Sequence, residues 1–269
     1  GGGLGAARKL CVDTGQLSED GRIATGLMTQ PRYGVAQWAG DAGPARDGQG
    51  WGPLPDTARG ATESQIRLVF HTTETKNMPG YSAGRFAPHT TYDARQRTWT
   101  QHGEHHRRVG TMLGMSRTGV LGNEISVQTE IIAYSDKAIA DRVGGLWVGD
   151  FNAGHYSDLA DYVTWCRVNL FPGHLPLVTA YGPAKDFASF TFGVDDITEM
   201  SDGEWLQAGG ILTAHGAAPQ QSHWDTGELD LHRIVDESLA AQQTPHMRDL
   251  DELEAQALRL VELIREAKR

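Results

Sequence analysis

Two runs of apolar and β-branched residues constrain the fold of this chain more than any other feature. The first, "SQIRLVFH", covers residues 64–71, and the second, "EISVQTEIIAY", covers residues 124–134. Runs of this length and composition are typical of strands buried within a sheet. The segment "HTTYDARQRTWTQH", residues 89–102, predicts two further short strands joined by a turn at Asp93–Gln96. Strands are therefore expected early in the chain.

Three helices are predicted later, at residues 157–171, 201–209 and 228–243. Ser157 is the expected N-cap of the first helix, and Cys166 lies on its buried face. Ser201 and Glu204 have the spacing of a capping box at the start of the second. Because strands and helices do not alternate regularly, the pattern predicts an α/β protein with a mixed central β-sheet flanked by helices.

The chain divides into three parts by composition. Residues 1–62 are rich in Gly, Pro, Arg and Asp, and they predict an N-terminal extension packed on a main domain at 63–243, with Trp38 and Trp51 as anchors. Residues 244–269 carry a coiled-coil-like apolar stripe and predict a C-terminal helix or linker. This helix either packs on its own domain, leads to a further module or self-associates.

The overall composition excludes several classes of partner. A net charge of −10 argues against broad binding to phosphates, so no nucleic-acid partner is expected. No apolar run approaches the roughly 20 residues that span a bilayer, so no membrane insertion is expected. The first residues also lack the hydrophobic region of a secretory signal. Two cysteines, Cys11 and Cys166, are too few for a disulfide framework.

The segment "LTAHGAAPQQSHWDTG", residues 212–227, brings two histidines and an aspartate into a stretch that favours neither helix nor strand. His71 ends a predicted buried strand, where side chains emerge at the edge of a sheet. Catalytic zinc takes three ligands from His, Asp, Glu or Cys and keeps one position for water. His71, His215 and Asp225 are therefore candidate metal ligands, although a lone histidine at a strand end is more often structural.

Four segments carry a resemblance to a known family: "RLVFHTTET", "PHTTYDARQRTWTQH", "ISVQTEIIAY" and "AHGAAPQQSHWDTG". In this order they resemble the type-2 N-acetylmuramoyl-L-alanine amidases, a zinc superfamily that includes phage amidase lysins and animal peptidoglycan recognition proteins. The "SDGEW" helix and the last segment are most similar to amidase modules of endolysins from phages of actinobacteria. The family closes its site with H-x9-D-x-G, which His215 and Asp225 fit, and its first ligand follows an apolar strand, as His71 does.

The resemblance implies an amidase type-2 fold and a Zn²⁺ ion held by these three residues. It also implies the reaction, which is hydrolysis of the amide between N-acetylmuramic acid and L-alanine in peptidoglycan. Zinc lowers the pKa of its bound water to about 7 and polarises the scissile carbonyl, and a general base takes the remaining proton.

The catalytic glutamate of the family lies on the strand that matches "ISVQTEI", where this chain offers Gln128 and Glu130 on one face. By position that glutamate falls on Gln128, which cannot act as a base. Glu130 is therefore the candidate base, with a supporting role beside an arginine or a ligand histidine as the alternative. His223 either donates to the developing oxyanion or is peripheral. Gln128, His89 and Trp224 are candidate substrate contacts, and core packing is the competing interpretation for His89 and Trp224.

The resemblance predicts the catalytic module of a phage endolysin, which accumulates in the host cytoplasm and is then released to the cell wall. The alternatives are a bacterial cell-wall recycling amidase, a peptidoglycan-binding module with little activity, and a zinc endopeptidase on another fold. The basic cluster "GEHHRR", residues 103–108, either faces carboxylates of the stem peptide or is a solvated loop. Trp99 borders the groove or packs in the core.

Overall fold

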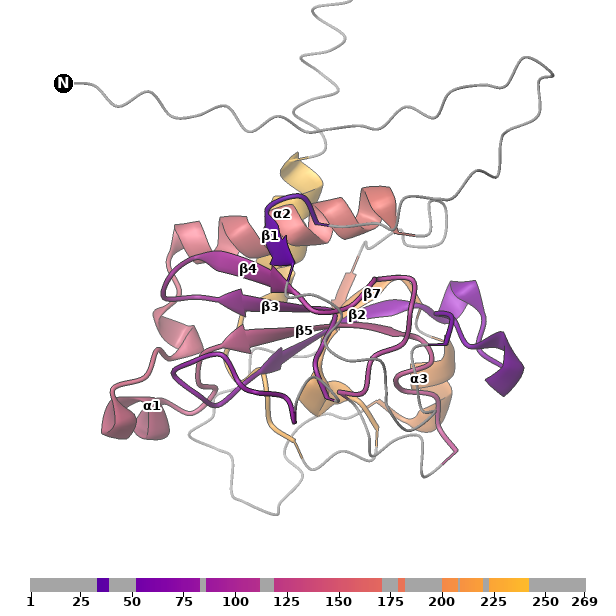
Figure 1. The fold of residues 1–269 in the computed structure, drawn as a ribbon, viewed down its shortest axis with the longest axis horizontal. Coiled ribbons are helices and arrows are strands. Elements are labelled where there is room, and N and C mark those ends of the chain that lie inside the picture. Colours follow the sequence, from indigo (N-terminus) through magenta and orange to yellow (C-terminus); the bar gives the residue numbers. More distant parts are fainter. Residues whose placement is uncertain are drawn as a thin grey trace, which may run out of the picture.

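A computed structural model of the chain describes residues 33–38, 52–82, 86–111, 119–170, 179–181, 200–207, 209–219 and 223–241. At the centre of the described residues is a seven-stranded sheet in the order β1-β4-β3-β5-β2-β7-β6 (Figure 1). The strands are β1 (Ala36–Trp38), β2 (Arg67–Thr72), β3 (Thr90–Asp93), β4 (Thr98–Gln101), β5 (Ser126–Ile132), β6 (Thr179–Tyr181) and β7 (Ile211–Ala214). β3 and β4 are antiparallel, whereas the other neighbouring pairs are parallel. The expected α/β class with a mixed sheet flanked by helices is confirmed.

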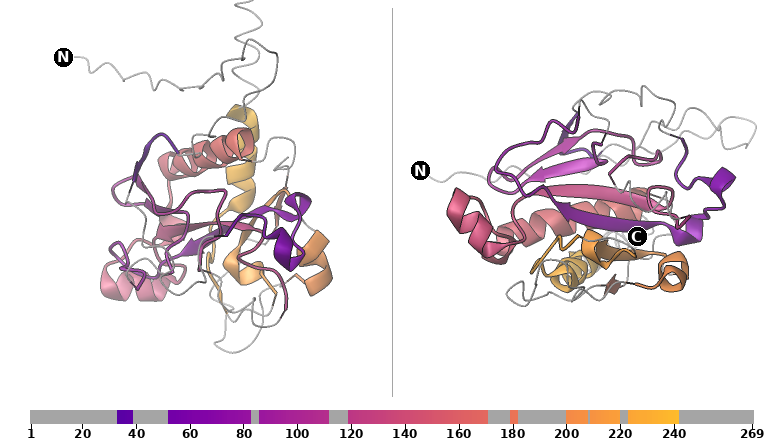
Figure 2. Two further views of the ribbon diagram at one scale, coloured as in Figure 1. Left: turned by 45° about the vertical axis from the view of Figure 1, so that its right-hand side comes forward. Right: turned by 90° about the horizontal axis from the view of Figure 1, so that it is seen from below.

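Helices cover both faces of this sheet (Figure 2). They are α1 (Lys137–Val143), α2 (Ala153–Asn169), α3 (Asp202–Gln207) and a helix at 231–241. Leu68 and Phe70 of β2 share one buried cluster with α2 and the helix at 231–241. Val69, between them, points to the other face and joins a second cluster with Trp205 of α3. Each such buried apolar side chain contributes about 1.5–3 kcal/mol to folding.

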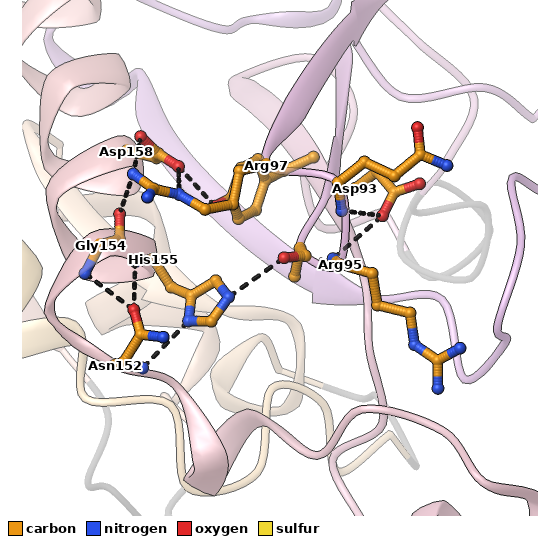
Figure 3. A network of polar contacts seen from close by, with 10 residues as sticks. Asp93, Arg95, Arg97, Asn152, Gly154, His155 and Asp158 are labelled. Atoms are coloured by element: carbon orange, nitrogen blue, oxygen red, sulfur yellow. Dashed lines mark hydrogen bonds and ion pairs between the residues drawn. The ribbon is translucent and has the colours of Figure 1, made fainter. Parts of the chain in front are cut away.

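Helix α2 begins one turn before the predicted N-cap Ser157, so that prediction was wrong. The Asn152 Oδ1 atom accepts hydrogen bonds from the backbone N–H groups of Gly154 at 2.9 Å and His155 at 3.3 Å. In return, His155 Nδ1 accepts from the backbone N–H of Asn152 at 2.9 Å (Figure 3). This reciprocal cap satisfies donors at the helix start that have no partner within the helix. Ser157 lies inside the helix instead.

The hairpin of β3 and β4 docks against the same helix. The predicted turn at Asp93–Gln96 is confirmed, and the Asp93 Oδ1 atom accepts from the backbone N–H groups of Arg95 at 3.0 Å and Gln96 at 3.1 Å. Arg97, just after the turn, makes two hydrogen bonds to the Asp158 carboxylate of α2, at 2.7 and 2.9 Å (Figure 3). These bonds hold the hairpin end of the sheet against α2.

The histidine-containing segment begins as a strand, which the sequence did not predict. Residues 211–214 form β7, in which Leu212 pairs with Leu68 and Thr213 with Val69 of β2. The neighbouring strand supplies the backbone partners and the burial that the local sequence lacks. The irregular part of the segment therefore begins only at His215.

The capping box at the start of α3 and the two terminal segments of the chain were also predicted from the sequence. The capping box is confirmed, because Ser201 N–H donates to the Glu204 carboxylate at 2.8 Å and Glu204 N–H donates to Ser201 Oγ at 3.3 Å. Residues 36–38, within the predicted N-terminal extension, form the edge strand β1 of the same sheet. Cys11, Trp51 and the predicted C-terminal helix at 244–269, with its self-association, lie outside the described residues. No helix in the described ranges has both the length and the apolar character that crossing a membrane requires.

Candidate metal centre

The centre lies where two adjacent parallel strands end. His71 is the fifth residue of β2, and His215 directly follows β7. Because Phe70 and Ala214 are paired in register, the next residue of each strand emerges at the same edge of the sheet. The two imidazole rings consequently lie with their centroids 4.4 Å apart.

Asp225 reaches this point from the loop that follows. Its Oδ2 atom lies 3.3 Å from Nδ1 of His215 and 3.6 Å from Nδ1 of His71. One ligand atom from each of the three residues falls within 4.8 Å of the others, and all three side chains are buried. The backbone supports the carboxylate as well, because Thr72 N–H donates to the same Oδ2 atom at 3.4 Å. The structure thus brings together the three residues that the sequence identified.

Electrostatics leaves His71 and Asp225 in the protonation states that a cation needs. Burial, and then the neighbouring His215, lower the pKa of His71 to about 4, so its imidazole is neutral at pH 7. Burial alone would raise the pKa of Asp225, but His215 and His71 hold it well below its usual range. A neutral imidazole has a lone pair to give, and an ionised carboxylate is a strong ligand for divalent ions. This buried group could therefore hold a metal ion.

His223 extends the cluster toward solvent. Its ring stacks on that of His215 with the centroids 4.2 Å apart, and its Nδ1 atom lies 3.6 Å from Oδ1 of Asp225. The side chain is 55% exposed, in contrast to the three buried residues. Burial and then His215 lower the pKa of His223, while Asp225 acts in the opposite direction. His223 therefore stands at the accessible side of the centre, within reach of a bound molecule.

Glu130 lies on β5, directly beside His71 of β2 in the sheet register. Residues paired in this way point to the same face, so the carboxyl group shares the face that carries the centre. Its Oε2 atom is buried and has no hydrogen-bond partner among the described residues. Burial, followed by the charges of Asp225 and Glu74, raises the pKa of Glu130 to about 8. A carboxyl group with this pKa is mostly protonated at pH 7, and once ionised it is a stronger base than an exposed glutamate.

The three residues predicted to contact substrate, which are Gln128, His89 and Trp224, are less exposed than His223. Gln128 is fully buried, and its side-chain amide donates to Asn123 Oδ1 at 2.7 Å. His89 is also fully buried, and its Nδ1 atom accepts from the backbone N–H of Gln128 while Nε2 donates to the carbonyl of Arg107. This arrangement matches the core interpretation of His89. Trp224, partly buried, stands between His223 and Asp225 on the loop.

The basic cluster at 103–108 is partly buried, and its charged side chains pair with carboxylates. His105 is fully buried and bonds through Nε2 to the Tyr162 hydroxyl at 2.9 Å. Glu104 pairs with Arg107 at 2.9 Å, and Arg108 pairs with Asp56 at 2.9 Å. The interpretation as a solvated loop was wrong, because the sheet, α2 and the residues around 56 bury much of the segment; contact with stem-peptide carboxylates stays a prediction. Trp99 packs in the core, 4% exposed.

Sequence reasoning missed a set of polar residues around Glu130. Thr91 of β3 is its other neighbour in the register, and its hydroxyl contacts the Tyr81 hydroxyl at 2.8 Å and His102 Nε2 at 2.9 Å. Glu74, three residues after His71, influences both Glu130 and Asp225 electrostatically. The one available signal was its position directly after a strand that ends in a candidate ligand.

Comparisons with known proteins add nothing to this geometry. No family model, no curated protein and no solved structure matches the chain. The functional interpretation therefore rests on the side chains gathered at the ends of β2 and β7.

Proposed function

We propose that this protein is a zinc-dependent amidase that hydrolyses the bond between N-acetylmuramic acid and L-alanine in peptidoglycan, as the catalytic module of a phage endolysin. The observation that carries the proposal is the convergence of His71, His215 and Asp225 beside Glu130, a partly buried glutamate whose buried Oε2 atom has no hydrogen-bond partner among the described residues. The order of motifs, which resembles type-2 amidases, supplies the fold family and the substrate. The same resemblance implies that the protein accumulates in the host cytoplasm before its release to the cell wall.

The donor set favours zinc among divalent ions. Two imidazoles and one carboxylate suit a borderline metal, and three protein ligands leave a position open for water. Zinc bound there would supply a Lewis acid for the scissile carbonyl and a water molecule of lowered pKa. Glu130, on the same face as His71, would remove the proton from the attacking water and pass it to the leaving nitrogen.

Water and the amide substrate are the only reactants that this hydrolysis needs. The oxygen of water joins the carbonyl carbon of the lactyl group, the C–N bond breaks, and the proton held by Glu130 goes to the released amino group of L-alanine. Negative charge develops on the carbonyl oxygen during attack. His223, half-exposed beside His215, can donate a hydrogen bond to that oxygen through an N–H group.

The test uses the full chain and a suspension of purified cell walls. We expect clearing of the suspension, new amino groups that labelling identifies as N-terminal alanine, and no new reducing sugar ends. Treatment with a chelator should abolish the release, and added zinc should restore it. N-terminal residues other than alanine would indicate an endopeptidase, and bound zinc without any released group would indicate a binding module.

A further inference from the structure

Glu74 occupies an unusual place directly after the strand that carries His71. Its backbone has φ +53°, a left-handed conformation that residues other than glycine rarely adopt. The backbone still follows β5 here, because Thr73 N–H donates to the carbonyl of Ile131 at 2.9 Å and Glu74 N–H donates to that of Ala133 at 3.2 Å. Glu74 therefore has an unusual backbone conformation in a segment that these two hydrogen bonds hold against the end of β5.

The Glu74 carboxylate joins two segments of the chain. Its Oε1 atom accepts from the Thr72 hydroxyl at 2.7 Å, from the Ser135 backbone N–H at 3.0 Å and from the Ser135 hydroxyl at 2.6 Å. Its Oε2 atom is buried and has no hydrogen-bond partner among the described residues. Three donors on one oxygen fix the end of β2 against the segment that follows β5.

Both ends of this connection also touch the loop that carries Asp225. Thr72, one donor to Glu74, gives its backbone N–H to Asp225 Oδ2, the atom that faces both ligand histidines. Ser135, the other donor, lies against Gly227, where an added Cβ would come within 2.7 Å of the Ser135 carbonyl oxygen. The segments that supply His71 and Asp225 are therefore held relative to each other through Glu74.

We propose that Glu74 is a positioning residue for the metal centre, which sets where the Asp225 carboxylate stands relative to the two imidazoles. The proposal rests on the proposed function in one respect, namely that the centre holds zinc. Glu74 acts through Thr72 and Ser135. Removing groups that orient metal ligands typically weakens metal binding by about 10- to 100-fold.

The experiment compares Glu74→Gln and Ser135→Ala with Asp158→Asn in the full chain. Asp158 is a matched control, because it is also a buried carboxylate with several donors, the Tyr92 hydroxyl and Arg97, but it belongs to the hairpin contact with α2. Zinc affinity is measured by competition with a chromophoric chelator. The visible absorption of the Co²⁺-loaded protein reports the coordination geometry, and circular dichroism reports folding and Tm.

We expect Glu74→Gln to bind zinc about 10- to 100-fold more weakly and to shift the Co²⁺ absorption bands. Ser135→Ala removes one donor and keeps the carboxylate. It should weaken zinc binding and shift the Co²⁺ absorption bands in the same direction as Glu74→Gln, but to a smaller extent. Asp158→Asn should lower Tm without changing the affinity or the spectrum.

Two results separate this proposal from the proposed function. Wild-type zinc affinity and an unchanged Co²⁺ spectrum in folded Glu74→Gln would overturn the positioning role and leave the amidase proposal standing. A wild-type chain that binds zinc but releases nothing from cell walls, with weakened zinc binding in Glu74→Gln, would overturn the amidase proposal and support the role of Glu74. A wild-type chain that binds no zinc would overturn both.

Discussion

The Oδ2 atom of Asp225 lies within 3.6 Å of an Nδ1 atom from each of two histidines, His71 and His215. The 3.6 Å between His71 Nδ1 and this oxygen is longer than a normal hydrogen bond. The His71 imidazole is neutral at pH 7, because burial lowers its pKa to about 4. His215 Nδ1 is within hydrogen-bond distance of the same oxygen, and the three buried groups converge closely enough that they could hold a metal ion.

Replacing Glu130 by glutamine should lower turnover while zinc is retained. Glutamine keeps the size of the side chain but cannot accept a proton, and general base catalysis contributes about 10²- to 10⁴-fold to rates. We expect a fall in kcat of that order, measured as release of N-terminal alanine, with unchanged zinc content. Glu63→Gln, an exposed glutamate outside the site, is the control. Normal turnover in Glu130→Gln would remove Glu130 from the mechanism.

The role of His223 can be separated from that of the ligands. His223→Ala should lower kcat by about 10²- to 10³-fold, because it removes a donor to the developing oxyanion. Zinc binding should persist, since the half-exposed ring is not one of the three converging groups. His223→Lys should restore part of the rate by supplying another donor. Equal loss of zinc in His223→Ala and Asp225→Ala would show that His223 is itself a ligand.

Two substitutions in α2 test where this helix begins. Asn152→Ala should lower the free energy of unfolding by about 1 kcal/mol, because it removes the acceptor for two backbone N–H groups. Ser157→Ala should change it by less than about 0.5 kcal/mol, because Ser157 is exposed inside the helix. Urea unfolding measures both values. A larger loss for Ser157→Ala than for Asn152→Ala would contradict the observed cap.

Buried histidines should make the protein sensitive to acid. Burial lowers the pKa of His89 and His102 from 6.5 to about 4, so the folded state binds fewer protons than the unfolded state between these values. Their contribution to stability is present above pH 6.5 and is lost as the pH falls toward 4. Burial raises the pKa of Glu130 to about 8, so its contribution to stability is present at low pH and is lost as the pH rises toward 8.

The test measures the free energy of unfolding of the wild-type protein and of His102→Gln, both metal-free, at several pH values between 7 and 4.5. The slope of unfolding free energy against pH should be shallower in the variant, because one of the buried groups no longer takes up a proton on unfolding. Glutamine keeps a side chain that can bond to the Thr91 hydroxyl. Identical slopes would mean that His102 does not titrate differently in the two states.

Much of the sheet and of the metal centre follows from the sequence. The apolar runs around His71 and Glu130 predicted buried strands, because a strand covered on both faces needs apolar side chains on each. The turn at Asp93–Gln96 was also predicted correctly. The candidate ligands His215 and Asp225 could be identified because a loop rarely gathers such side chains without a use.

The remaining features depend on contacts between remote residues. β7 forms because β2 lies beside it, and α2 begins at Ala153 instead of after Ser157 because the side chains of Asn152 and His155 form a reciprocal cap. His105 is a core residue because Tyr162 and Trp165 of α2 and the ring of His89 contact it. The sequence signals Glu74 only by its position soon after the strand that carries His71, because its importance lies in the hydrogen bonds to Ser135.

Substitution of the ligands should remove the metal and the activity together. His71→Ala and Asp225→Ala should each lose zinc and wall hydrolysis while the fold, followed by circular dichroism, persists in most of the molecules. His232→Ala, an exposed histidine on the helix at 231–241, should retain both and is the control. Zinc retained by Asp225→Ala would place the ligand set elsewhere.

Zinc-edge X-ray absorption of the full chain tests the central claim most directly. We predict one zinc ion per chain, surrounded by nitrogen and oxygen at about 2.0–2.2 Å with the scattering pattern of imidazole rings. The signal should disappear in Asp225→Ala. A chain that retains no zinc after purification in its presence, or one whose zinc has sulfur ligands at about 2.3 Å, would contradict the account.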